Sequence, residues 1–149
     1  MGLLANAILP LRIALFAVAV PWLFRLPIRR LEALANPPGQ PETADTAQAE
    51  RIIWWTTTVC RAARRFTTHP CQVRGLTLYY FLGRAGVDLA LVFGVGRVGE
   101  DYSGHCWLVK DGEPYLETTD PRIHFTPMYR FHRGDAAVLP DTVDPRIFT

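Results

Sequence analysis

The sequence predicts an α+β domain preceded by an N-terminal helical segment. The chain has 149 residues, of which about half are apolar, and this is enough for one hydrophobic core but not for two. Between residues 52 and 80, apolar residues recur at spacings of three and four, which is typical of helices. From residue 87 onward, β-branched runs, alternation and turn signals replace that spacing and indicate antiparallel strands.

Residues 1–36 form an apolar N-terminal segment that is expected to be helical. The uncharged run 13–24 contains one proline and is followed by Arg25, Arg29 and Arg30. A secretory signal peptide fits poorly, because a basic region before the apolar run is missing. The arginines suit a helix at a membrane surface or a span that ends in the cytoplasm. A helix packed on the protein's own core or on a partner chain explains the pattern equally well.

A linker is predicted over residues 37–44, where prolines and a glycine replace apolar residues. The main domain is therefore assigned to residues 45–149. Either Thr43 or Asp45 is expected to cap its first helix. The apolar stripe through which this helix should pack consists of Ile52, Trp55, Val59, Ala62 and Phe66.

Charge and cysteine content limit the classes of function. A net charge of +2 gives no strong case for nucleic-acid binding from charge alone. The arginines are concentrated in residues 51–74, where they form either a solvated helix face or a binding patch. The three cysteines, Cys60, Cys71 and Cys106, match no zinc-binding spacing and are an odd number. We therefore expect reduced thiols in a cytoplasmic protein without a metal or an organic cofactor, and membrane association through residues 1–36 stays open.

A second helix is predicted to begin near Cys71. Pro70 suits an early helical position, because its missing N–H would have had no partner there. Thr67 or Thr68 can accept hydrogen bonds from neighbouring donors. The helix dipole and the first N–H groups favour an anion, so the Cys71 thiol should ionise readily and act as a nucleophile. The same N–H groups could hold the oxyanion that forms after attack on a carbonyl.

The strand predicted over residues 87–95 runs into the sequence 94–99, which matches G-x-G-x-x-G letter for letter. A dinucleotide-binding loop needs a helix to start there, whereas another strand follows in this chain. We therefore interpret these glycines as a flexible loop between antiparallel strands.

His105 begins the next predicted strand, residues 105–110, and Asp111-Gly112 predicts a hairpin into residues 113–117. The segment 125–131 either lines a substrate cleft or completes the sheet. Its proline argues against a long regular element.

The returning strand of this hairpin brings carboxylates back towards His105. A carboxylate there can accept the imidazole N–H and fix the tautomer of the ring. A two-residue turn would place Thr118 opposite His105, whereas a three-residue turn would place Glu117 there. Glu117 is therefore the first candidate and Asp120 the alternative. Together with Cys71, these residues have the order of a thiol nucleophile, its base and an orienting carboxylate.

Three stretches, in this order and spacing, resemble the transglutaminase-like cysteine peptidase domain of lasso peptide biosynthesis B2 proteins over residues 65–131. They are residues 70–78 (PCQVRGLTL), 86–95 (GVDLALVFGV) and 104–112 (GHCWLVKDG). Residues 26–31 (LPIRRL) are also similar to the segment that often precedes this domain.

The resemblance implies a transglutaminase-like, papain-like core, in which a helix carrying Cys71 packs on an antiparallel sheet carrying His105. It implies a leader peptidase that cuts the leader from a ribosomally synthesised precursor peptide. The expected partners are that precursor, a small B1-type leader-recognition protein and the ATP-dependent lasso cyclase that acts afterwards. The family commonly has an aspartate about where Glu117 stands, so this chain departs from the pattern there.

Two other functions remain open at this stage. A transglutaminase-fold acyltransferase would use the same three residues but pass the acyl group to an amine. A non-catalytic scaffold at a membrane surface would instead use the apolar N-terminal run, and its triad would be vestigial.

Overall fold

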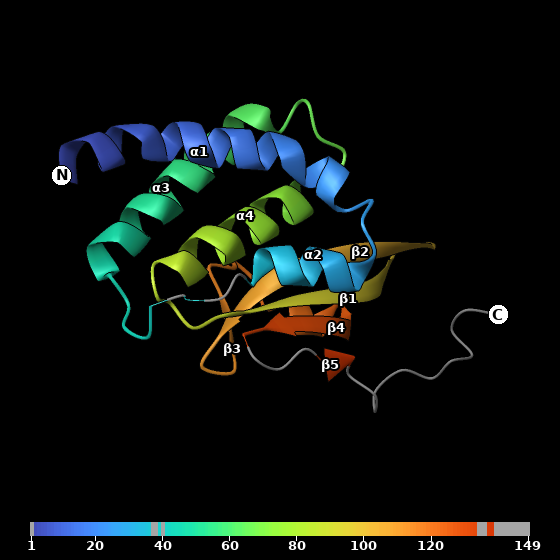
Figure 1. Ribbon diagram of the computed structural model, residues 1–149. Coiled ribbons are helices and arrows are strands. Elements are labelled where there is room, and N and C mark those ends of the chain that lie inside the picture. The colour runs from blue at the N-terminus through green and yellow to red at the C-terminus, as the bar shows by residue number, and fades with distance from the viewer. Residues whose placement is uncertain (1, 37–38, 40, 134–136, 139–149) are drawn as a thin grey trace. The chain divides into compact units, whose positions relative to one another are not determined.

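The computed structural model describes residues 2–36, 39, 41–133 and 137–138, without the side chains of residues 2–7 and 137–138. Helices come first along the chain and strands follow, so the predicted α+β class is confirmed (Figure 1). The chain divides into two compact units, Met1–Asp88 and Leu89–Thr149. We call them the helical unit and the sheet unit.

Helix α1 (Gly2–Leu23) packs on two other helices of the helical unit, α3 and α4 (Figure 1). Its buried residues are Leu9, Ile13, Ala17 and Val20. Their spacings of three and four place them on one face, so this face of α1 belongs to the protein's own core. Among the residues that the structure describes, no helix combines the length and apolar character needed to cross a bilayer.

The short helix α2 (Ile28–Ala35) precedes the predicted linker. Of that linker, residues 37, 38 and 40 lie outside the described part of the chain, and residues 41–44 adopt no helix or strand. The hydroxyl group of Tyr79 donates to Asn36 Oδ1 at 2.6 Å and so ties the end of α2 to the third turn of α4.

Helix α3 (Thr46–Ala63) begins as predicted, because Asp45 accepts a hydrogen bond from the Gln48 N–H at 3.0 Å. The predicted apolar stripe is wrong in part. The buried residues of α3 are Ala49, Ile52 and Thr56, so Ile52 is the one stripe residue among them. Phe66 lies beyond the end of the helix and is 89% exposed. Both α1 and α4 pack on α3, so the buried face follows these two neighbours rather than the largest side chains.

Helix α4 (Pro70–Arg84) is the central helix of its unit and contacts α1, α2 and α3. Val73, Leu76 and Leu78 are among its buried side chains. The helix ends before Gly86, which has a φ of +81°. A side chain there would meet the backbone of Thr43, so glycine satisfies both the conformation and the close approach.

The sheet unit is antiparallel throughout, with the strand order β3-β2-β1-β4-β5. Its elements are β1 (Ala90–Val98), β2 (Asp101–Lys110), β3 (Glu113–Tyr115), the 3₁₀ helix η1 (Pro121–Ile123), β4 (Thr126–His132) and β5 (Ala137–Val138). Four large side chains of this unit are at most 1% exposed, namely Leu91, Trp107, Leu108 and Phe131.

The glycine-rich stretch is not the loop that the sequence suggested. Strand β1 continues through Gly94 and Gly96 to Val98, which pairs with Asp101, so only two residues form the turn. A Cβ atom on Gly94 would lie 2.7 Å from the Trp107 ring, and one on Gly96 would meet the backbone of residue 124. These two glycines are therefore strand residues that make room for their neighbours.

Strand β4 completes the sheet in spite of Pro127. The register between β1 and β4 shifts between Phe93, which pairs with Tyr129, and Gly94, which pairs with Pro127. The extra residue, Met128, forms a bulge. Proline is tolerated at such an irregularity, so the segment forms a strand of seven residues that is interrupted by a bulge.

Candidate active site

Each compact unit carries one part of the predicted triad, and the helical unit carries Cys71. Pro70 is the first residue of α4, so Cys71 is the second. The Thr67 hydroxyl accepts a hydrogen bond from the His69 N–H at 3.3 Å, as predicted for one of the two threonines. Cys71 is half-buried and forms no disulfide. Its thiol therefore lies at the positive end of the α4 dipole, where a thiolate is favoured.

The first turn of α4 already uses two of its backbone donors. The N–H groups of Gln72 and Val73 both donate to the His69 carbonyl oxygen, at 3.1 and 3.3 Å. Pro70 has no N–H group. The expected oxyanion site therefore cannot rely on the N–H groups of Gln72 and Val73 in this conformation.

The sheet unit carries the histidine, which lies among aromatic rings. His105 is on β2, and its ring stacks on that of Trp107 with centroids 6.0 Å apart. The Phe125 ring, just before β4, lies 5.0 Å away. Only 24% of the His105 side chain is exposed. These contacts restrict the rotation of the imidazole ring, which a positioned general base requires.

Glu117 is the carboxylate that the structure places beside His105. Its Oε2 atom lies 3.5 Å from His105 Nε2, and 15% of its side chain is exposed. This distance is longer than a typical N–H···O hydrogen bond, and it is short enough for an ion pair when the imidazole is protonated.

The route by which Glu117 reaches His105 differs from either predicted register. Asp111 and Gly112 form a two-residue turn, with φ values of +52° and +82°, so the predicted hairpin is confirmed. That register would place Thr118 opposite His105. However, β3 ends at Tyr115, and Leu116 has a left-handed φ of +60°. The chain turns there, and Glu117 reaches the position near His105 that the register assigned to Thr118.

Asp120, the alternative carboxylate, is bound to another residue. Its Oδ1 accepts from the Arg122 N–H at 2.9 Å, and its Oδ2 accepts from Arg122 Nη2 at 2.7 Å. These hydrogen bonds lower the pKa of Asp120. The same nitrogen of Arg122 also donates to Glu113 Oε2 at 2.7 Å, and both partners raise the pKa of the guanidinium group. Arg122 therefore joins both ends of the segment that carries Glu117.

The sequence did not reveal several of these neighbours. Alternation along β2 places Trp107 on the face of His105, but no pattern indicated that Phe125 would reach the same ring. Neither Leu116 nor Arg122 carries a local signal for its role, since leucine rarely adopts a positive φ. In the part of the chain that the structure describes, no three His, Cys, Asp or Glu side chains gather in a way that could hold a metal ion.

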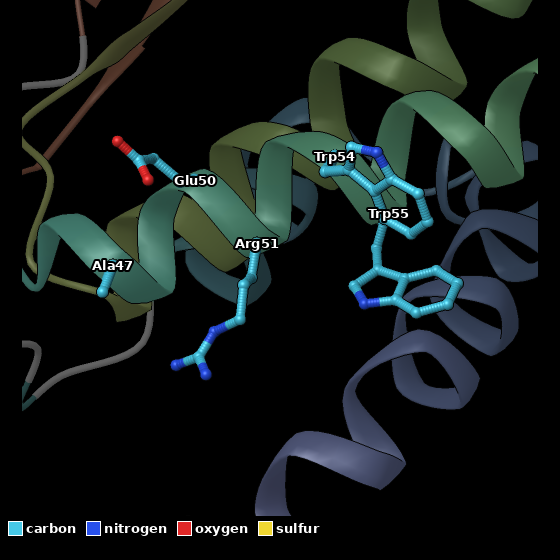
Figure 2. Close-up of a pocket in the computed structure, with 5 residues that line it drawn as sticks. All are labelled: Ala47, Glu50, Arg51, Trp54 and Trp55. Carbon is cyan, nitrogen blue, oxygen red and sulfur yellow. The ribbon is translucent and has the colours of Figure 1, made fainter.

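The other cysteine of the helical unit has a different environment. Cys60 lies on α3, and burial raises the pKa of its thiol, although the charge of Arg74 acts in the opposite direction. On the same helix, Trp54 and Trp55 meet edge to face at 4.6 Å (Figure 2). Together with Arg51 they border an open surface depression of about 460 Å³.

The chain matches the family described as the Transglutaminase-like superfamily over residues 13–130. The matched range runs from α1 to β4 and includes Cys71, His105 and Glu117. No curated protein and no solved structure matches the chain.

Proposed function

The chain belongs to the transglutaminase-like superfamily, which includes cysteine peptidases, and from this premise we propose that it is a cysteine peptidase. Cys71 is the nucleophile, His105 the general base and acid, and Glu117 the residue that orients the imidazole. The proposal requires the Cys71 thiol to come within hydrogen-bond reach of His105.

The observation that carries the proposal is the 3.5 Å distance between His105 Nε2 and Glu117 Oε2. A half-buried imidazole held by a carboxylate and by aromatic rings is the arrangement that a base in a nucleophile–base–carboxylate triad needs. Because Nε2 faces Glu117, the other ring nitrogen, Nδ1, is assigned to take the proton of the thiol.

The reaction begins when Cys71 transfers its proton to His105 Nδ1 and the thiolate attacks the scissile carbonyl carbon. The positive end of α4 stabilises the oxyanion of the tetrahedral intermediate. His105 then gives the proton to the leaving amine, and the C–N bond breaks to leave a thioester on Cys71. His105 next removes a proton from water, which attacks the thioester and releases the carboxylic acid and the thiol.

For the substrate, we propose the leader region of a ribosomally synthesised precursor peptide in lasso peptide biosynthesis. The support is the resemblance of residues 70–78, 86–95 and 104–112 to lasso peptide B2 proteins. On this proposal a separate B1-type protein recognises the leader, and an ATP-dependent cyclase uses the freed core peptide.

The test is to mix the full-length protein with a candidate precursor and its leader-recognition protein, and to follow the precursor mass. The wild type should release the leader, whereas Cys71→Ala and His105→Ala should not. Cys60→Ala is the matched control, since it removes a helix cysteine that has no role in the proposal, and it should cleave like the wild type. Cleavage by Cys71→Ala would refute the assignment of the nucleophile.

An added primary amine separates hydrolysis from acyl transfer. A free carboxylate as the main product supports the peptidase, and an amide of the added amine would favour the acyltransferase alternative instead.

The pairing of Cys71 with His105 has its own test. In a His105→Cys variant, mild oxidation should join residues 71 and 105 in a disulfide that peptide mass mapping detects. Formation of a disulfide needs Cα atoms no more than about 7 Å apart. If the thiols at residues 71 and 105 both stay reduced while the protein remains folded, the two positions do not approach as closely as a disulfide requires, which counts against the direct pairing of Cys71 with His105.

A further inference from the structure

Helix α1 carries a second apolar stripe, on the face opposite to its buried one. At about 100° per residue, the stripe falls within an arc of about 80°, roughly opposite the face that packs on α3 and α4. Its side chains are 49–63% exposed, and they are Ile8, Leu11, Leu15, Val18 and Trp22.

Phe66 extends this stripe beyond α1. Val18 and Trp22 of α1, Val59 of α3 and Phe66 line an apolar cavity of about 250 Å³, and the Phe66 side chain is 89% exposed. We call the five stripe residues together with Phe66 the apolar patch. Continuous exposed apolar surface of this kind usually marks an interaction site.

Exposed arginines occur close to the patch residues along the chain. In the N-terminal segment they are Arg12, Arg25, Arg29 and Arg30, and before Phe66 they are Arg61, Arg64 and Arg65. No acidic residue occurs in residues 1–31 or in residues 51–87. The helical unit holds ten arginines against five acidic residues, a net charge of +5, whereas the sheet unit holds six basic and nine acidic residues, a net charge of −3.

We propose that the apolar patch docks on the surface of a lipid bilayer with anionic headgroups. In residues 13–24 the only side-chain hydrogen-bonding group is the indole N–H of Trp22, so this part of the patch offers almost no polar contact to a protein partner. The hydrocarbon region of a bilayer can bury such an apolar surface without hydrogen bonds. Tryptophan prefers the boundary between hydrocarbon and headgroups, and arginine binds lipid phosphates.

The packing of α1 determines how the helix would lie on the membrane. Ile13 and Val20 are fully buried within the protein. Only the opposite face of the helix is therefore available, so α1 lies along the bilayer surface while its inner face stays on α3 and α4. This docking does not depend on the proposed peptidase activity.

The experiment is co-sedimentation of the full-length protein with vesicles of phosphatidylcholine alone or of phosphatidylcholine mixed with phosphatidylglycerol. The wild type should sediment with the mixed vesicles and should dissociate at high salt. Leu15→Gln/Trp22→Gln and Arg29→Gln/Arg30→Gln should each weaken binding roughly tenfold or more. Because these side chains are exposed, the variants should remain folded, which circular dichroism verifies.

The sheet unit offers matched controls. Ile123 is 69% exposed, and Arg97 is also exposed. Ile123→Gln and Arg97→Gln should therefore bind the mixed vesicles like the wild type. Absence of wild-type binding, or equal losses in the control and patch variants, would overturn the proposal. A wild-type dimer that becomes monomeric in Leu15→Gln/Trp22→Gln, without vesicle binding, would identify a second copy of the chain as the occupant instead.

Discussion

Substitution of Gly94 by alanine should disturb His105 through Trp107. Gly94 pairs with His105 across β1 and β2. A Cβ atom at this position would lie 2.7 and 2.8 Å from two carbons of the Trp107 ring and 2.9 Å from the Thr126 carbonyl oxygen. Trp107 is 1% exposed, so its ring cannot move away without displacing other core side chains. The ring also stacks on that of His105. The strain therefore passes to the imidazole.

The expected size follows from overpacking of a dense core, which typically costs about 1–3 kcal/mol. For a chain of this length the melting temperature should fall by roughly 2–12 °C. A shift of the base by a fraction of an ångström should also lower kcat/KM, by about ten- to a hundredfold.

Gly104→Ala is the matched control, because Gly104 precedes His105 on β2 and an added Cβ would find only the Gly94 carbonyl oxygen, at 3.9 Å. Its melting temperature should stay the same or rise slightly, since alanine restricts the unfolded chain. Thermal melts by circular dichroism and cleavage rates of both variants check the prediction. Equal stability and activity of Gly94→Ala and Gly104→Ala would refute the argument that Trp107 transmits the strain.

The remaining predictions concern the carboxylates, the thiols and a helix cap. Glu117→Gln should lower kcat/KM by roughly a hundredfold or more, because an amide does not stabilise the imidazolium ion. Asp120→Asn should stay within about threefold of the wild type in the same cleavage assay, because residue 120 binds Arg122 rather than His105 and the asparagine amide oxygen can still accept from that arginine; a loss as large as that of Glu117→Gln would restore Asp120 as the third residue. Iodoacetamide at neutral pH should modify Cys71 before Cys60, because burial raises the pKa of the Cys60 thiol, and peptide mass mapping gives the order. Asp45→Ala removes the cap of α3 and should cost about 1 kcal/mol, or roughly 2–4 °C in a thermal melt; an unchanged melt would show that the cap contributes nothing.

Features with a local cause could be predicted from the sequence. Asp111 and Gly112 both tolerate a positive φ, so the hairpin can be predicted from these two adjacent residue types. Asp45 and Pro70 likewise mark the starts of α3 and α4 through the capping groups of a helix.

Features that depend on distant neighbours could not be predicted. The glycines of β1 suggested a loop, but residues on β2 and before β4 occupy the space next to Gly94 and Gly96. The buried face of α3 is set by α1 and α4 together, so Phe66 continued the apolar spacing without joining the core.

The candidate site shows the same division. The types and order of Cys71, His105 and a carboxylate are visible in the chain. The approach of Glu117 to His105 depends on the left-handed backbone conformation of Leu116. A leucine in the sequence does not predict that conformation.

The guanidinium group of Arg122 links the two ends of the segment from Glu113 to Arg122. Strand β3 is only three residues long, so few backbone hydrogen bonds hold the end of this segment in place. Arg122 supplies side-chain hydrogen bonds in their place. Its planar guanidinium group donates to Asp120 through Nε and Nη2, and Nη2 also donates to Glu113. Lysine has the same charge but presents a single rotating ammonium group, so it cannot reproduce this geometry. The guanidinium group of Arg122, nine residues after Glu113, therefore limits the conformational freedom of the backbone that carries Glu117. A positive charge without this geometry would not limit it.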